Sequence, residues 1–344
     1  MARINSSTLT SNYSWRSVHL SLAVFTTLVI LAEVILHLLP QPLPSRTIQS
    51  HIPEIINLPT PDIQIYGESV THGAINDWVL AEALGMNLSQ IRNDSVPSTS
   101  AFFAYAQLKR QVAAGHIPHL LILGYVARSY TVPMVPKFLS HVASASEIAE
   151  ISLSICPPLE TTLQGLLGKF SFGYRHRSEY NDLLRQRFSK EALASFTTPS
   201  IGILARQQNL PHSIDEAGSE QDYRQAVAMT RFHDLKFAPP DEQKNSLQRF
   251  FALARQHQIR VLLLSMPKPS IVYQSHESSG FNAAYDDFLD GFITDGNVEW
   301  LVREQKSLPP TDFIDGVHLT KSAGFRFSQQ VATSLKGHLL QKPL

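Results

Sequence analysis

The chain is poor in the features that mark several large classes of protein. It has one cysteine, Cys156, so no disulfide can form within the chain, and we expect a buried structural thiol there. Net charge is zero and only 17% of residues are charged, which gives no support to a nucleic-acid-binding face. No glycine-rich phosphate loop follows a predicted strand, and no His, Cys and Asp cluster has metal-ligand spacing. We therefore predict no nucleic-acid partner, no metal and no organic cofactor.

The longest apolar stretch lies near the N-terminus. Leu20–Leu39 is 20 residues long, which is about the length that crosses the ~30 Å hydrocarbon core of a bilayer. Arg3 and Arg16 precede it without an acidic residue, which favours a cytoplasmic N-terminus, and Pro40 ends the predicted helix. A signal anchor is expected. A cleaved signal peptide is the alternative, although the run is long for one and no small-x-small cleavage site follows promptly. The expected division is a cytoplasmic tail over 1–17, an anchor over 18–40 and a linker over 41–60.

Two polar residues interrupt this apolar segment. Glu33 and His37 are four residues apart and therefore share one face of the predicted helix. They could make a polar contact with another membrane helix or act in proton transfer. The simpler interpretation is a pair near the outer end of the segment that reaches the interface or satisfies itself.

The remainder of the chain, 61–340, alternates short apolar runs with stretches of helical periodicity. This alternation predicts an α/β domain with a flavodoxin-like, doubly wound parallel sheet covered by helices on both faces. The expected strands are 63–66, 87–93, 119–123, 259–264 and 298–302, and the expected helices are 73–85, 99–114, 246–257, 281–292 and 320–340. Residues from about 130 to 240 break the rhythm and are interpreted as a helical insertion. Its basic segment Tyr174–Arg177, with Arg185 and Arg187, fits either an anionic glycan or lipid headgroup or, more simply, a solvated helix face.

Two short segments far apart in the sequence carry reactive side chains. In Asp62–Gly73, a strand leads into a tight turn at Gly67-Glu68-Ser69, and a serine at such a turn can serve as a nucleophile. Asp315 and His318 lie three residues apart before the last helix, where a carboxylate can orient an imidazole base. Because sites form at the carboxyl ends of parallel strands, both segments are expected at one edge of the sheet.

Other polar residues near these segments have ordinary interpretations as well as functional ones. His72 could line a pocket near Ser69, although an exposed histidine at a helix start is the simpler interpretation. Lys268 follows a predicted strand at the same edge of the sheet, where it fits either a substrate contact or a solvated loop.

Gly67-Glu-Ser69 together with Asp315-x-x-His318-Leu resembles the SGNH, or GDSL-type, hydrolase superfamily. Within it the chain is most similar to the membrane-anchored DltD- and AlgJ/AlgX-like branch, which is associated with acylation of cell-surface polymers. The resemblance implies that Ser69 is the nucleophile, His318 the base and Asp315 its orienting partner. It also implies an SGNH-type fold over roughly 60–340, apart from the insertion.

The chain departs from the family pattern in three places. The usual Gly-Asp-Ser is Gly-Glu-Ser, the second block reads Asn93-Asp-Ser-Val-Pro-Ser98, and the third reads Gly124-Tyr-Val-Ala-Arg128 without the usual Asn. The remaining candidates for binding the oxyanion are the backbone N–H of Ser69, a backbone N–H near Ser98, Asn93 and Arg128.

These features together predict a membrane-anchored serine esterase or O-acyltransferase outside the cytoplasm, in the periplasm or at the cell exterior. Its expected substrate is an acylated glycan or another ester, and the family resemblance adds a membrane acyltransferase as a partner. The alternative is an accessory protein of surface-polymer assembly that has the same fold and binds glycan without catalysis.

Overall fold

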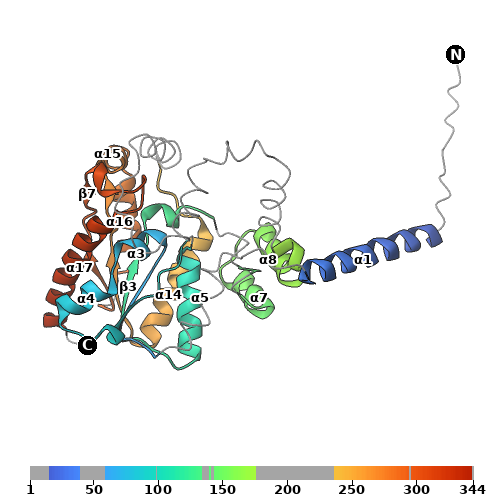
Figure 1. Ribbon diagram of the computed structural model, residues 1–344, viewed down its shortest axis with the longest axis horizontal. Coiled ribbons are helices and arrows are strands. Elements are labelled where there is room, and N and C mark those ends of the chain that lie inside the picture. The colour runs from blue at the N-terminus through green and yellow to red at the C-terminus, as the bar shows by residue number, and fades with distance from the viewer. Residues whose placement is uncertain are drawn as a thin grey trace, which may run out of the picture.

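The computed structural model describes residues 15–38, 59–97, 99–133, 139–140, 143–175, 236–293 and 296–342. A five-stranded parallel sheet forms the centre of the α/β domain (Figure 1). Its strands are β1 (Ile63–Gly67), β2 (Ile91–Asn93), β3 (Leu120–Gly124), β4 (Arg260–Leu264) and β6 (Val298–Val302). Their order is β2-β1-β3-β4-β6, so β1 and β3 are neighbours and Gly67 pairs with Gly124. The predicted α/β fold with a parallel sheet is confirmed.

Helices cover both faces of this sheet. α3 (Ser69–Ala74), α4 (Asp77–Leu84) and α17 (Lys321–Gln341) pack on one face with Ile63 and Ile65 of β1. α5 (Ala101–Ala113), α14 (Asp241–Gln256) and α16 (Phe281–Asp290) pack on the other with Leu121 and Leu123 of β3. Figure 1 shows the sheet between α17 and the pair α5 and α14. Each large apolar side chain buried in this way contributes about 1.5–3 kcal/mol relative to exposure.

The helix predicted over 73–85 is wrong in its boundaries. The chain forms two helices instead, because α3 ends at Ala74 with Ile75 as its C-cap, and Asn76 begins the next helix. The Asn76 side chain accepts hydrogen bonds from the N–H groups of Trp78 at 3.0 Å and Val79 at 3.2 Å, as a helix N-cap does. α3 therefore begins at Ser69 itself, directly after β1 and Glu68. The nucleophile candidate is the first residue of a helix rather than part of a loop that precedes one.

Other elements lie at the carboxyl edge of the sheet or beside it. β5 (Lys268–Pro269) and β7 (Ser307–Leu308) form a second, two-stranded parallel sheet, which was not predicted. α15 (Ser270–Ser278) follows β5. The described part of the domain also contains three 3₁₀ turns: η1 (Leu88–Gln90), η2 (Ala127–Tyr130) and η3 (Pro310–Asp312). The strand predicted over 87–93 is thus half 3₁₀ turn and half strand.

The described part of the predicted insertion is helical. It consists of α7 (Ala145–Ser154), α8 (Leu159–Phe170) and α9 (Phe172–Arg175), whereas 176–235, with Arg177, Arg185 and Arg187, lies outside the described residues. α7 packs on α5 through Phe102, Ile148 and Ile151. The prediction of a buried thiol is wrong, because Cys156 occupies the turn between α7 and α8 with φ 55° and is exposed.

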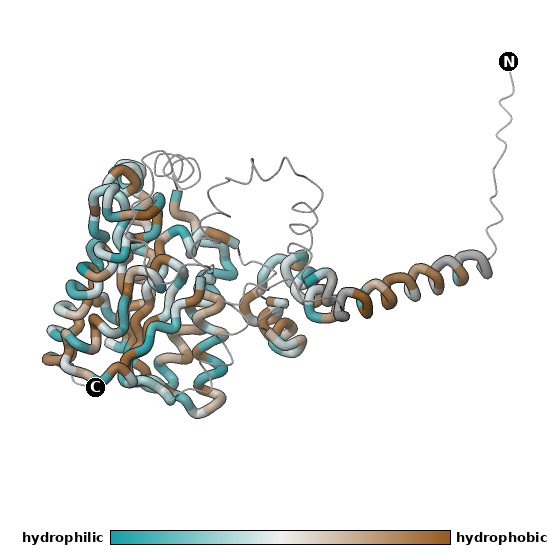
Figure 2. Tube along the Cα trace, viewed as in Figure 1, coloured by the Kyte–Doolittle hydropathy of each residue, from teal (hydrophilic) through white to brown (hydrophobic). Residues whose placement is uncertain are grey.

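The N-terminal segment forms one helix, α1 (Trp15–Leu38), which runs away from the α/β domain (Figure 1). Hydrophobic residues lie along it in Figure 2, and nine of its large apolar side chains are exposed by 45–67%. Within the described ranges, no helix meets the combined requirement of length and apolar character for crossing a membrane. The anchor over 18–40 stays a prediction, as do the tail over 1–17 and the linker over 41–60, most of which lie outside the described residues.

Candidate active site

The turn between β1 and α3 presents Ser69 at the carboxyl edge of the sheet, and it requires a glycine. A Cβ atom at Gly67 would lie 2.4 Å from the Cβ of Thr71 and 2.7 Å from the carbonyl oxygen of Gly124. Neither contact is one that a real side chain could make, and the second is with backbone. The missing side chain at Gly67 therefore lets the start of α3 lie against β3, which fixes where Ser69 stands.

A second tight turn holds the acid and the imidazole. Phe313 and Leu319 form an isolated antiparallel bridge, and both side chains are buried. The N–H of Ile314 donates to the carbonyl oxygen of His318 at 2.8 Å and closes the turn. Thr320 then caps α17 by accepting a hydrogen bond from the N–H of Ala323. The segment from 314 to 318 is thus fixed at both ends by the fold.

These two turns bring the three predicted side chains into hydrogen-bond contact. The hydroxyl oxygen of Ser69 lies 2.9 Å from Nε2 of His318, and Nδ1 of His318 lies 2.8 Å from Oδ2 of Asp315. The other carboxylate oxygen of Asp315 accepts the backbone N–H groups of Val317 at 2.8 Å and His318 at 2.7 Å. Asp315 therefore both shapes the turn and orients the imidazole. Ser69 and His318 are 249 positions apart, so only the fold joins them.

The charges around His318 favour its protonated form. Burial alone lowers the pKa of His318, but the hydrogen bond and charge of Asp315, with a smaller contribution from Glu68, outweigh burial and raise it. Burial raises the pKa of Asp315, but the hydrogen bond and charge of His318 and the backbone N–H groups outweigh burial and lower it. Asp315 thus remains ionised and stabilises the imidazolium that forms when His318 accepts a proton.

Glu68, which precedes the serine, is a second carboxyl group close to His318 that sequence reasoning did not assign to the site. It is only 9% exposed, and its carboxyl oxygens accept the N–H of Val126 at 3.2 Å and the hydroxyl of Ser129. Burial raises the pKa of Glu68, and these hydrogen bonds and the nearby charges of His318 and Arg128 offset part of that effect. Glu68 connects the nucleophile turn to the segment after β3. The available signal was its place in Gly-Glu-Ser, where the family has Asp.

Asn93, one of the predicted oxyanion-binding residues, directs its side-chain amide elsewhere. The side-chain amide of Asn93 donates to the carbonyl oxygens of Thr71 at 3.3 Å and Ile75 at 2.9 Å. Both amide hydrogens are therefore directed at the end of α3, which corrects the prediction of Asn93 as an oxyanion donor. Its side-chain oxygen accepts the N–H of Ser95 at 3.1 Å, which also occupies that backbone donor. Ser98 lies outside the described residues.

The two remaining candidates lie at the correct edge of the sheet. The backbone N–H of Ser69 lies in the first turn of α3, where N–H groups point away from the helix. Arg128 belongs to η2 after β3, is exposed, and is close enough to Glu68 for its charge to lower the pKa of that carboxyl. Val126 stands where the family has its third-block Asn, and its N–H is bound to Glu68.

His72 has the exposure expected of it but not the position, and neither interpretation holds for Lys268. His72 is exposed in the last turn of α3 rather than at a helix start. Lys268 is only 7% exposed, and its ammonium group lies 2.9 Å from the side-chain oxygen of Asn282 and 3.1 Å from Nδ1 of His276. It also lies 5.2 Å from the centre of the Phe281 ring. Burial and the charge of Lys268 lower the pKa of His276 to about 3, so His276 is neutral and can accept. These contacts join β5 to α15 and α16 and make Lys268 structural.

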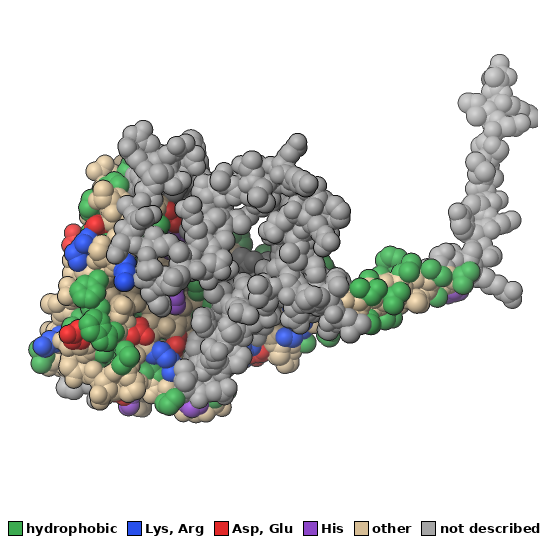
Figure 3. All heavy atoms as spheres, viewed as in Figure 1, with side chains coloured by type: hydrophobic (Ala, Val, Ile, Leu, Met, Phe, Trp, Pro, Cys, Tyr) green, Lys and Arg blue, Asp and Glu red, His purple; other side chains and the backbone are tan. Residues whose placement is uncertain are grey.

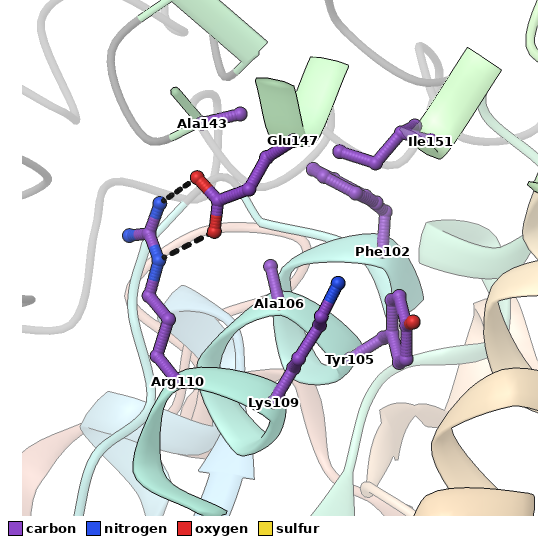
Figure 4. A pocket seen from close by; sticks show the side chains of 8 residues that line it. All are labelled: Phe102, Tyr105, Ala106, Lys109, Arg110, Ala143, Glu147 and Ile151. Atoms are coloured by element: carbon purple, nitrogen blue, oxygen red, sulfur yellow. Dashed lines mark hydrogen bonds and ion pairs between the residues drawn. The ribbon is translucent and has the colours of Figure 1, made fainter. Parts of the chain in front are cut away.

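A pocket lies between α5 and α7, in a separate part of the molecule (Figure 4). Its walls include Phe102, Tyr105 and Ile151, and its charged groups are already paired. Arg110 donates to the two carboxylate oxygens of Glu147 at 2.8 and 3.1 Å. The pocket therefore belongs to the contact between the insertion and the sheet domain. Within the described ranges, no group of His, Cys, Asp and Glu could hold a metal ion.

Neither the models of known protein families nor the curated proteins include a match to this chain. The assignment of function therefore depends on the geometry of Ser69, His318 and Asp315 and on the motifs that contain them.

Proposed function

We propose that this chain is a membrane-anchored, extracytoplasmic serine esterase or O-acyltransferase of the SGNH type, acting on acyl esters of cell-surface polysaccharide. The observation that carries the proposal is the continuous series of hydrogen bonds from Ser69 through His318 to Asp315, at 2.9 and 2.8 Å. A serine on a turn is common, but a serine in contact with an imidazole that a buried carboxylate orients is the arrangement that activates a hydroxyl. The chain order Ser, Asp, His and the three-residue spacing of the last two are those of the SGNH pattern.

The chemistry follows from the contacts of each atom. Ser69 Oγ attacks the acyl carbonyl carbon while its proton passes to Nε2 of His318, and the negative charge of Asp315 stabilises the resulting imidazolium. The tetrahedral oxyanion is bound by the backbone N–H of Ser69 and, in this proposal, by Arg128. The carbon–oxygen bond to the leaving alcohol then breaks, and that alcohol takes the proton from His318. Water or a sugar hydroxyl repeats these steps in reverse, with His318 as its base, and releases the acyl group from Ser69.

Membrane attachment is supported by α1. Its described side chains are continuous from 23 to 35, and the sequence extends the same apolar run from Leu20 to Leu39. Four consecutive residues, Leu28 to Leu31, are exposed by 45–58%, so apolar side chains point in every direction around the helix. A helix that is apolar all round is stable in an apolar environment and not in water. Arg3 and Arg16, which precede the apolar run, favour a cytoplasmic N-terminus and an extracytoplasmic sheet domain.

A second candidate function is supported by the position of Asn93. Because its amide is directed at α3, the site has fewer oxyanion donors than the family pattern, and loss of one such donor costs about 3 kcal/mol of transition-state stabilisation. A protein that binds glycan at this edge without turnover would tolerate that loss. Such a protein would bind acetylated polysaccharide equally well as wild type and as Ser69→Ala, and would show no esterase activity in either form.

The proposed activity is tested with the full-length chain in detergent. Hydrolysis of p-nitrophenyl acetate and release of acetate from an O-acetylated polysaccharide would be compared for wild type and Ser69→Ala. The matched control is Ser278→Ala, at the end of α15, where the serine hydroxyl donates only to the carbonyl oxygen of Ser275. We expect loss of both activities in Ser69→Ala and wild-type rates in the control. Equal rates in wild type and Ser69→Ala would refute a catalytic role for Ser69. Adding a deacetylated polysaccharide as acceptor then distinguishes transfer from hydrolysis.

A further inference from the structure

Helix α8 directs large apolar residues to solvent and small or polar residues toward the protein, which is the reverse of an ordinary surface helix. Four large apolar side chains point to solvent: Leu159 is 73% exposed, Leu163 50%, Leu167 53% and Phe170 78%. Their spacing of four, four and three residues places them on one face of the helix. We call these four residues the α8 stripe. The opposite face holds the buried residues Thr161, Thr162, Gly165 and Gly168.

The buried face of α8 is fixed against the protein, so the α8 stripe cannot turn inward. A Cβ atom at Gly165 would lie 2.9 Å from the Cβ of Leu139, and one at Gly168 would lie 2.6 Å from the Cβ of Ser140. At the end of the helix, the guanidinium of Arg175 donates to the carbonyl oxygens of Gly168 at 2.6 Å and Lys169 at 2.8 Å. These contacts fix the rotation of α8 about its axis and leave its apolar side outward.

The C-terminal end of α8, where Phe170 of the α8 stripe lies, is close to α1. Ser171, the residue after α8, donates its hydroxyl to the carboxylate of Glu33 on α1, and the charge of Glu33 also acts on Arg175. α9, which follows Ser171, packs on α1. Glu33 is near the C-terminal end of α1, which is the predicted outer end of the anchor. Figure 1 shows α8 at this end of α1, and Figure 3 shows hydrophobic side chains along the length of α1.

We propose that the α8 stripe inserts into the outer interface of the phospholipid bilayer that α1 enters, so that α8 lies along the membrane surface. This proposal rests on the membrane attachment in the proposed function. A helix whose apolar face enters the boundary between headgroups and acyl chains lies parallel to the membrane plane. The hydrogen bond from Ser171 to Glu33 joins the two membrane contacts and restricts how the insertion is oriented relative to α1.

Lipid is favoured over a protein partner because of the surface that adjoins the α8 stripe. A protein partner in a groove would cover one side of a helix, whereas Leu28, Val29 and Ile30 of α1 are exposed in successive directions by 58%, 45% and 58%. A bilayer covers all sides of α1 and the single outward side of α8 at once. Leu153, near the end of α7, is a further large apolar side chain in this region and is 84% exposed.

Because the chain has one cysteine, a single replacement allows a fluorophore to be attached at a chosen position. In a Cys156→Ser background, Leu163→Cys places an environment-sensitive fluorophore in the α8 stripe. The matched control is Leu340→Cys in the last turn of α17, where the leucine is 78% exposed and α17 lies on the opposite side of the sheet from α5 (Figure 1). Each full-length variant is reconstituted into phosphatidylcholine vesicles. Quenching by lipids that carry a nitroxide on the acyl chain is compared with quenching by aqueous iodide, after thermal unfolding has shown that both variants fold.

We expect the fluorophore at 163 to be quenched several-fold more strongly by the lipid nitroxide than the fluorophore at 340, and the order to reverse with iodide. If both respond equally to iodide while the protein floats with the vesicles, the proposal for α8 is overturned and the anchor stands. If the protein does not float with the vesicles, both are overturned. Protection from iodide in native membranes but not in pure lipid vesicles would show a protein over the α8 stripe and would overturn the lipid assignment. None of these outcomes depends on esterase activity.

Discussion

Replacing Asp315 by Asn separates the structural role of this residue from its role in catalysis. The carbonyl oxygen of an asparagine can still accept the N–H groups of Val317 and His318, which the carboxylate accepts at 2.8 and 2.7 Å. The turn is therefore expected to survive. Hydrogen bonds to a charged acceptor contribute about 1.5–3 kcal/mol and those to a neutral one about 1 kcal/mol, so unfolding should become easier by about 1 kcal/mol.

The amide group of the asparagine has the opposite effect on His318. Its NH₂ would face Nδ1, which lies 2.8 Å from the present carboxylate oxygen, and Nδ1 would then have to accept rather than donate. The imidazole proton would move to Nε2, which faces the hydroxyl of Ser69 at 2.9 Å and could no longer accept its proton. In the serine-protease template the same exchange lowers kcat by about 10 000-fold. That factor corresponds to about 5 kcal/mol of activation free energy.

The assay is kcat/KM for p-nitrophenyl acetate from pH 5 to 9, with thermal unfolding measured on the same samples. The matched control is Asp312→Asn, three residues earlier, where the carboxylate pairs with Arg326 at 2.6 Å on an exposed surface. Because exposed pairs contribute less than about 1 kcal/mol, the control should keep wild-type activity. The template predicts that Asp315→Asn keeps only about one ten-thousandth of wild-type activity. A folded variant with more than about a tenth of wild-type activity would refute the role assigned to Asp315.

Three further changes test the surroundings of Ser69. Gly67→Ala should destabilise the protein by about 1–3 kcal/mol in urea unfolding, because the new Cβ would overlap buried atoms at 2.4 Å. In the control Gly73→Ala the new Cβ meets nothing within 4 Å and should not destabilise the protein. Equal unfolding midpoints for the two variants would contradict the packing argument. In wild type, kcat/KM should rise with pH as His318 loses its proton, with a midpoint above the ordinary histidine pKa of 6.5. Glu68→Gln should move this midpoint to lower pH, because the charge of Glu68 helps to raise the pKa of His318. An unchanged profile would show that Glu68 does not act on His318. Asn93→Ala should lower the free energy of unfolding by about 1–3 kcal/mol, because the carbonyl oxygen of Ile75 loses its side-chain donor while that of Thr71 keeps the N–H of Ile75, and should leave kcat/KM for p-nitrophenyl acetate unchanged. A loss of activity with no loss of stability would return Asn93 to the oxyanion site.

The sequence predicted the parts of the site that topology determines. Alternating strands and helices imply a parallel sheet, and residues that follow parallel strands share its carboxyl edge, so Ser69, Asp315 and His318 were expected at one edge. Strand order did not predict their contact, because β1 and β6 are not neighbours in the sheet. Their roles as nucleophile, orienting acid and base were implied by the resemblance to the SGNH pattern. The N-cap at Thr320 was predictable because its capping interaction is local in sequence.

The rest of the site depends on side-chain directions that periodicity does not encode. Asn93 lies at the expected edge, but its amide turns to the end of α3, because the break at Asn76 leaves carbonyl groups there that need a donor. Lys268 lies at the same edge and is buried by α15 and α16, and the small sheet that places it consists of two-residue strands too short to leave a pattern. Cys156 is exposed because a turn, rather than a helix, contains it.

Labelling with a fluorophosphonate probe tests the catalytic assignment most directly. Such a probe reacts with a serine whose hydroxyl is activated and not with an ordinary surface serine. The account predicts one covalent adduct on the full-length chain, located on Ser69 by peptide mass spectrometry, and no adduct on folded His318→Ala. An unlabelled wild-type protein, or an adduct on Ser69 that forms equally fast without His318, would contradict it.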